Sequence, residues 1–152
     1  MKKSFVVLLG LLSAAALANN AGGEQQGNQP MLNLAVYDTS TQVAKPLGTQ
    51  YSVSAKGRQL CWVAFNMPFS ANNKVIEIFQ SPDKATFSDT VGLVVSSEDK
   101  LWHKVSSSLS SQNNEFIQRC WAFDKNDPLG KYTLDIQINN VRFASQEFEL
   151  VK

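Results

Sequence analysis

The sequence has few of the side chains that usually carry chemistry, with one histidine and two cysteines among 152 residues. A structural zinc site takes four thiol or imidazole ligands, and these three residues cannot complete one. The histidine, His103, stands between Trp102 and Lys104 in an expected strand, and no G-x-S-x-G motif accompanies it. We therefore expect a surface histidine, no cofactor, no metal, and a protein that is not an enzyme.

Recognisable sets of carboxylates are also lacking. The segment Asp124-Lys125-Asn126-Asp127 brings three oxygen-bearing side chains together, but it lacks the full series of a calcium loop and is better explained as an ordinary turn. Glycosidases use a pair of carboxylates at a set separation. Nothing in the sequence fixes the separation of Glu147 from Glu149, or of Glu77 from Asp135.

An excess of positive charge is missing as well. The formal net charge is +1, and loss of Lys2 and Lys3 with the segment described next leaves 12 basic against 13 acidic residues. Nucleic-acid binding needs a clustered positive field, and anionic lipid attracts polybasic segments. The balance argues against nucleic acid and the membrane surface as partners.

Residues 1–18 have the three parts of a secretory signal peptide. Lys2 and Lys3 precede an apolar run that starts at Phe5, and Ala16-Leu17-Ala18 is a small-residue cleavage site. The apolar run of about 14 residues is shorter than the roughly 20 that a spanning helix needs. The opening MKKSF resembles export signals of Gram-negative bacteria, so we expect a periplasmic or secreted protein with no membrane span in the mature chain.

Two regions follow the expected cleavage site. Residues 19–30 (NNAGGEQQGNQP) contain no apolar side chain larger than alanine, and we expect them to form a flexible N-terminal arm. Residues 31–152 have the length of one domain with a single core.

Export places Cys61 and Cys120 in an oxidising compartment, where an even cysteine count indicates a disulfide. The competing explanations are a redox pair or a metal pair. Redox pairs usually have C-x-x-C spacing, which these residues lack. We therefore expect one structural disulfide between Cys61 and Cys120.

Beyond Met31 the pattern is that of β-structure, with short runs of period two separated by Gly, Pro, Asn and Ser. Lys131–Asn139 alternates most regularly and predicts a strand with one wet face. Nine strands are expected, at Leu32–Tyr37, Tyr51–Ala55, Gln59–Phe65, Lys74–Gln80, Thr90–Ser96, Trp102–Ser108, Glu115–Phe123, Lys131–Asn139 and Val141–Val151. The short Ser-rich stretch Ser106–Asn114 is interpreted as a mobile loop. The pattern predicts an all-β antiparallel β-sandwich of about seven to nine strands.

The last two expected strands carry a hairpin signal and a change of phase. Asn139 tolerates the positive φ that a tight turn requires. Val141 and Phe143 are odd-numbered, whereas Phe148 and Leu150 are even-numbered. One extra residue near Ala144–Gln146 would restore a single buried face, so we expect a β-bulge there.

The segment Asp127-Pro128-Leu129-Gly130-Lys131-Tyr132 resembles the entry to the penultimate strand of immunoglobulin-like domains. There a D-x-G/A-x-Y pattern forms the tyrosine corner, in which the phenol bonds back to upstream backbone. Many bacterial exported Ig-like domains end in a similar D-P-x-G-x-Y, followed by a strand, a two-residue turn and a last strand. The resemblance covers Asp127–Val151 and implies an Ig-like fold with Tyr132 as its structural corner, and no particular activity. Asp127 is one residue too far from Tyr132 for the usual pattern, and Cys120 falls one strand earlier than in antibody domains.

A near-repeat surrounds the cysteines, since Gln59–Phe65 (QLCWVAF) is similar to Gln118–Phe123 (QRCWAF). If the two segments are antiparallel neighbours joined by the disulfide, Trp62 lies opposite Arg119 and Leu60 lies opposite Trp121. Both indoles then share a face, with Arg119 placed for a cation–π contact. Neither face is polar, so the pattern leaves open whether the cysteines or the tryptophans point into the core. If the tryptophans are outside, Trp62, Arg119 and Trp121 form a binding face.

The sequence does not establish a biochemical function. A rigid, aromatic-rich sheet scaffold without a catalytic set favours a non-catalytic binding module for another envelope or extracellular protein. One alternative is carbohydrate binding by exposed Trp62, Trp121 and Trp102. Another is a secreted hydrolase inhibitor that presents Gly57–Arg58 or Ser106–Asn114. Edge-strand pairing with a partner is a further mode open to any sandwich.

Overall fold

The computed structural model describes residues 29–152. The expected signal peptide (1–18) and nearly all of the expected N-terminal arm (19–30) lie outside the described residues. The part that is described is built of strands and turns and contains no helix. It therefore has no helix long and apolar enough to cross a membrane.

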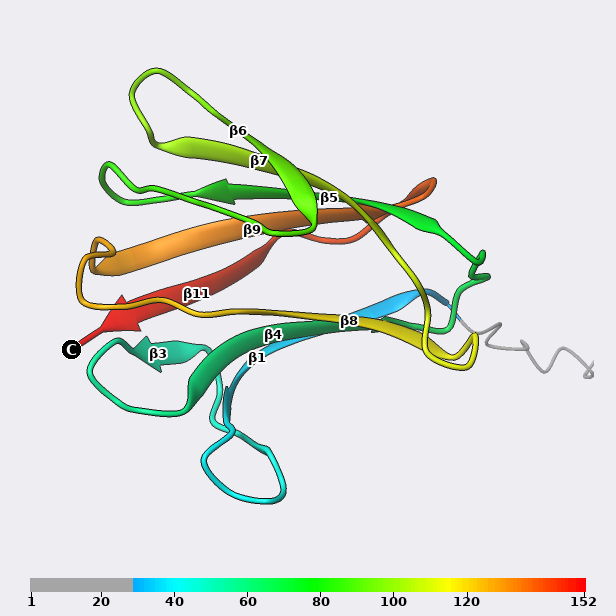
Figure 1. Cartoon of the computed structure of the whole chain (residues 1–152), viewed down its shortest axis with the longest axis horizontal. Coiled ribbons are helices and arrows are strands. Elements are labelled where there is room, and N and C mark those ends of the chain that lie inside the picture. The colour runs from blue at the N-terminus through cyan, green and yellow to red at the C-terminus, as the bar shows by residue number, and fades with distance from the viewer. Residues whose placement is uncertain (1–28) are drawn as a thin grey trace, which may run out of the picture.

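Within residues 29–152, eleven strands form two sheets that face each other (Figure 1). The strands are β1 (Met31–Asp38), β2 (Lys45–Pro46), β3 (Gln50–Ser52), β4 (Arg58–Phe65), β5 (Asn73–Gln80), β6 (Gly92–Ser96), β7 (Trp102–Leu109), β8 (Phe116–Trp121), β9 (Gly130–Ile138), β10 (Val141–Arg142) and β11 (Gln146–Val151). The smaller sheet has the order β2-β1-β4-β8. The larger has the order β3-β11-β9-β5-β7-β6, with β10 paired to β9.

The predicted fold class is confirmed as an all-β sandwich with one disulfide. Every strand pair is antiparallel except β3 with β11, which is parallel. Eleven strands are found where nine were expected, because the two-residue strand β2 was not expected and the last expected strand is divided into β10 and β11. The Ser-rich stretch is also less loop-like than expected, since Ser106–Leu109 lies within β7.

The hairpin of β9 with β10 and β11 carries the predicted extra residue. Val141 pairs with Ile138 and Gln146 pairs with Leu134. Between these two pairs the chain advances by five residues on the β10–β11 side and by four residues on β9. The extra residue falls at 143–145, where the strand is interrupted. Beyond it Phe148 points inward and is buried. Asn139 has a φ of 53°, the left-handed conformation expected of it in the turn.

The core lies between the two sheets and is built from the alternate, inward-facing residues of each strand. The smaller sheet contributes residues such as Leu60 and Ile117, and the larger contributes Phe79, Leu134 and many others. Its aromatic part includes a stacked pair, Tyr132 and Phe148, with ring centroids 5.0 Å apart. The phenol of Tyr132 donates a hydrogen bond to the backbone carbonyl of Pro128 at 2.8 Å.

Candidate functional site

The two Cys-Trp segments form neighbouring strands, β4 and β8, of the smaller sheet. Cys61 lies opposite Cys120 and is joined to it by the predicted disulfide. In the same register Trp62 faces Arg119, and Leu60 faces Trp121, as the near-repeat predicts.

The structure decides the question that the sequence left open, because the tryptophans point into the sandwich. Trp62 is fully buried, and Trp121 is 9% exposed. The cysteines point to the outer face of the sheet, as do the half-buried Val63 and Phe65 on the same strand. The expected binding face of Trp62, Arg119 and Trp121 is thereby corrected, since its two indoles are covered by the larger sheet and cannot form a platform in solvent.

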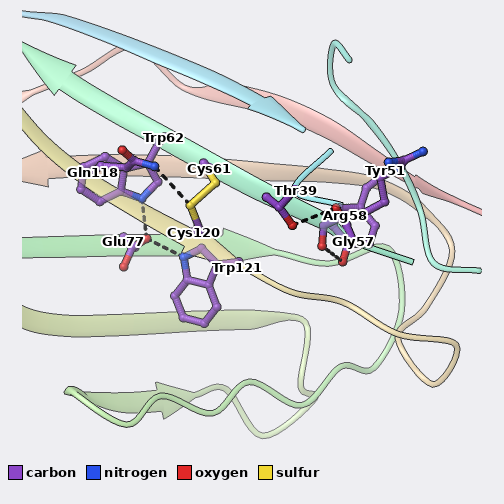
Figure 2. The surroundings of a disulfide bond; sticks show 10 residues. All are labelled: Thr39, Tyr51, Gly57, Arg58, Cys61, Trp62, Glu77, Gln118, Cys120 and Trp121. Atoms are coloured by element: carbon purple, nitrogen blue, oxygen red, sulfur yellow. Dashed lines mark hydrogen bonds between the residues drawn. A yellow bond between two sulfur atoms is a disulfide. The ribbon is translucent and has the colours of Figure 1, made fainter. Parts of the chain in front are cut away.

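Both indoles converge on one carboxylate, that of Glu77 at the centre of the larger sheet (Figure 2). Glu77 lies on β5 and is fully buried. Its Oε1 atom accepts hydrogen bonds from Nε1 of Trp62 at 2.7 Å and from Nε1 of Trp121 at 2.8 Å. One side chain of the larger sheet is thus bonded to two strands of the smaller sheet.

Arg119 completes this group from the inward face of β8. Its Nε atom lies 3.1 Å from Oε2 of Glu77, and one terminal nitrogen lies 2.5 Å from Oδ2 of Asp89. Its other terminal nitrogen donates to Oγ of Ser107 at 3.0 Å. The guanidinium also lies over the ring of Trp121, 4.6 Å from its centroid, which is the predicted kind of contact. We call Trp62, Glu77, Asp89, Ser107, Arg119 and Trp121 the Glu77 network.

Electrostatics differ between the two acids of the network. Burial raises the pKa of Glu77, while the charge of Arg119 and the two indole N–H groups oppose that rise. Burial would also raise the pKa of Asp89, but the hydrogen bond and charge of Arg119 outweigh it and lower that pKa. Every partner of the Glu77 carboxylate is a donor, so the ionised form is the one that the contacts satisfy. The network is an internal ion cluster that ties the sheets together.

The other expected candidates are separated by the fold. Glu77 faces inward, whereas its neighbour Ile78 pairs with Asp135 on the opposite face, so the two carboxylates do not share a site. In the turn after β8 the carboxylates of Asp124 and Asp127 accept bonds from backbone N–H groups, as ordinary turn chemistry requires. Within residues 29–152 no group of three His, Cys, Asp or Glu side chains could hold a metal ion.

A second feature, which the sequence did not reveal, is the exposed edge formed by β6. The side chains of Val91, Leu93 and Val95 are 63%, 67% and 51% exposed. Leu93 and Val95 belong to β6, the last strand of the larger sheet, at the top of Figure 1, and Val91 immediately precedes that strand; no described strand pairs with the other side of β6. The sequence predicted this strand, but alternation alone does not show where a strand stands in a sheet.

The backbone of β6 also offers unused hydrogen-bonding groups. The N–H of Ser97 donates to the carbonyl of Trp102 in continuation of the β6–β7 register. Because bonded and non-bonded pairs alternate along antiparallel strands, Val95 and Leu93 direct their backbone groups to β7. The residues that direct theirs to the free edge are Gly92, Val94 and Ser96.

Comparison with known proteins places this sandwich in a family. A family model described as the PM0630 beta sandwich domain matches residues 32–151. The chain belongs to this family. It is 29% identical over 132 residues to "Uncharacterized protein PM0630" of Pasteurella multocida (strain Pm70), covering 85% of this chain and 82% of that protein.

A solved structure is also similar to the PM0630 beta sandwich domain of this chain. It is the Pseudomonas fluorescens alkylpurine DNA glycosylase AlkC bound to DNA containing an abasic site analog, at a TM-score of 0.36 and 16% identity. The match covers 83% of this chain and 31% of that one, so this chain spans less than a third of the glycosylase. At this TM-score no activity follows from the likeness.

Within this PM0630 domain His103 differs from expectation, since it is fully buried and not on the surface. It points inward from β7, its ring lies 4.5 Å from that of Phe87, and its Nδ1 lies 2.8 Å from Oγ of Ser96. Burial lowers the pKa of His103; the Lys100 carbonyl opposes this. The sequence did not predict this burial, because the neighbours Trp102 and Lys104 do not show which face of the strand is covered.

We expect the free energy of unfolding to fall as the pH is lowered below roughly 6.5, where an unfolded histidine takes up its proton. The folded state resists that proton, so the stability is present above this pH and is lost below it, by at most about 1.4 kcal/mol per pH unit. Urea unfolding between about pH 7.5 and 5.5 measures the slope.

A His103→Gln variant is the control for this pH dependence. It should show less loss of stability on acidification than the unchanged chain. The difference between the two isolates His103 from Glu77, whose raised pKa acts in the opposite sense. Equal slopes in both proteins would contradict the assignment.

Proposed function

We propose that the protein is an exported, non-catalytic binding module that joins an extended segment of another polypeptide to its larger sheet at β6. The observation that carries this proposal is the free edge of β6, which has two exposed apolar side chains, Leu93 and Val95, a third at Val91 just before it, and backbone groups directed outward. Free N–H and C=O groups in a row are matched best by another strand.

The edge also lacks the usual protection against strand pairing. Natural edge strands are guarded by lysine, proline, bulges or a covering element. Residues 90–97 (TVGLVVSS) contain no charged residue and no proline, and the β6–β7 register is continuous. An unguarded apolar edge in a folded domain favours a role in recognition over a purely structural one.

Export and the finer fold belong to the same proposal. The predicted signal peptide and the disulfide support a periplasmic or secreted location. An Ig-like arrangement is supported by the Tyr132–Pro128 hydrogen bond at the start of β9. The carbohydrate alternative loses its main support, because two of its three tryptophans are buried.

Photo-crosslinking from β6 tests the proposal. The purified mature chain carries a photoreactive residue at Leu93 and is incubated with envelope and secreted fractions of its source cells. We expect a crosslinked polypeptide from this position. The matched control carries the same residue at Val43, which is 72% exposed but lies in the loop before β2. Equal products from both positions, or none from Leu93, would contradict strand pairing at β6.

A further inference from the structure

We propose that the segment joined at β6 is the β6 strand of a second copy of this chain, paired antiparallel about a twofold axis at Val94. The inference rests on the proposed function in that it uses the same edge. It goes further by naming the occupant and the register.

The backbone geometry of β6 is self-complementary about Val94. Val94 directs its N–H and C=O to the free edge, so two copies of it can exchange both hydrogen bonds as a bonded pair. Gly92 of one copy then faces Ser96 of the other, and both also direct their backbone groups outward. Val94 thus meets its own copy, and each other pair recurs on the opposite side of the axis, which is the isologous arrangement that twofold dimers require.

The exposed side chains fit the same register. In it Leu93 of one copy lies directly opposite Val95 of the other, in a non-bonded pair, where facing side chains are closest. The two most exposed apolar residues of the strand would therefore cover each other twice, once on each side of the axis. Shifting the pairing by one residue would instead place Val95 opposite Gly92, or Leu93 opposite Ser96, depending on the direction of the shift.

The residues of β6 that would pair carry no charge. The nearest acidic residues are Asp89 before the strand, which is turned inward and held by Arg119, and Glu98 and Asp99 after it; the Asp99 carboxylate accepts hydrogen bonds from Ser97 Oγ and from the N–H of Leu101 in the turn to β7. The mature chain has a net charge near zero by residue count. Along residues 90–97, which are uncharged, two copies therefore meet without the like-charge repulsion that normally keeps edge strands apart.

Sedimentation equilibrium over a concentration series is the first test. We expect a monomer–dimer equilibrium for the unchanged mature chain. The double variant Leu93→Lys with Val95→Lys places four lysines together across the axis and should weaken the dimer by at least about tenfold. The matched control Val43→Lys should leave it unchanged. Circular dichroism and thermal melting establish that all three proteins are folded.

Cysteine crosslinking tests the register. A 1:1 mixture of the single variants Leu93→Cys and Val95→Cys should form an intermolecular disulfide under mild oxidation, because these positions face each other. Each variant alone should crosslink more slowly, because identical positions lie diagonally apart. A Val43→Cys variant reports random collision.

The outcomes separate this inference from the proposed function. A chain that stays monomeric at every concentration, while Leu93 still crosslinks to a different polypeptide, overturns the second copy and leaves strand pairing in place. A dimer that survives both lysines and shows no 93–95 preference overturns β6 as the interface. A lysine-sensitive dimer with the 93–95 preference supports the inference.

Discussion

Replacing Glu77 by leucine should lower the free energy of unfolding by about 3–5 kcal/mol, the range for breaking a buried ion pair by removing one partner. The change leaves the buried Arg119 with Asp89 as its one remaining acidic partner. It also deprives the indole N–H groups of Trp62 and Trp121 of their acceptor. Each buried donor without a partner costs about 1–3 kcal/mol. Urea unfolding followed by tryptophan fluorescence measures the loss.

Two variants serve as controls for this prediction. Glu77→Gln keeps an oxygen that can accept from the indoles, so it should cost less than the leucine variant. Glu147→Gln changes an exposed glutamate on β11 and should stay within about 0.5 kcal/mol of the unchanged chain. A loss below about 1 kcal/mol for Glu77→Leu would mean that the network does not hold the sheets together.

The Glu77 network also connects the interior to the proposed binding edge. Asp89, its outermost member, lies three residues before β6, and a Cβ added to Gly92 would come within 2.6 Å of its Oδ2 atom. The ion pair with Arg119 therefore fixes where β6 begins, and the small Gly92 lets the strand pass close to it. The buried network thus supports the exposed edge strand.

The pairing of β4 with β8 could be predicted from the sequence because two local signals agreed. Export and an even cysteine count indicated the disulfide, and alternation then fixed Trp62 opposite Arg119 and Leu60 opposite Trp121. The extra residue between β10 and β11 was equally accessible, because a change of phase along one strand needs no knowledge of its neighbours.

The direction of the tryptophans could not be predicted, because both faces of β4 and β8 are apolar. The decisive residue, Glu77, lies on the other sheet, 15 residues from Trp62 and 44 from Trp121. A glutamate within a strand normally indicates a solvent face. Its burial depends on three donors that converge only after the sheets pack. The exposure of Leu93 could not be predicted for a similar reason, because the alternation of apolar and polar residues does not show the order of strands in a sheet.

Removing the disulfide by replacing Cys61 and Cys120 with serine should lower the free energy of unfolding by about 4 kcal/mol on the chain-entropy model. The bond closes a long loop, with a sequence separation of 59, which limits the freedom of the unfolded chain. The corresponding fall in melting temperature is about 10–20 °C for a domain of this size. Thermal unfolding followed by circular dichroism measures it.

The single variant Cys61→Ser should melt at a similarly lowered temperature and leave Cys120 open to a thiol reagent. Its tryptophan fluorescence spectrum gives an internal control. The disulfide joins β4 and β8 on the outer face, whereas Glu77 holds both indoles on the inner face of the same strands. Below its melting point the variant should therefore keep the blue-shifted emission of buried tryptophans. An unchanged melting temperature would contradict the stabilising role of the bond. Red-shifted emission in the folded variant would show that the Glu77 network cannot keep the two strands in place without the disulfide.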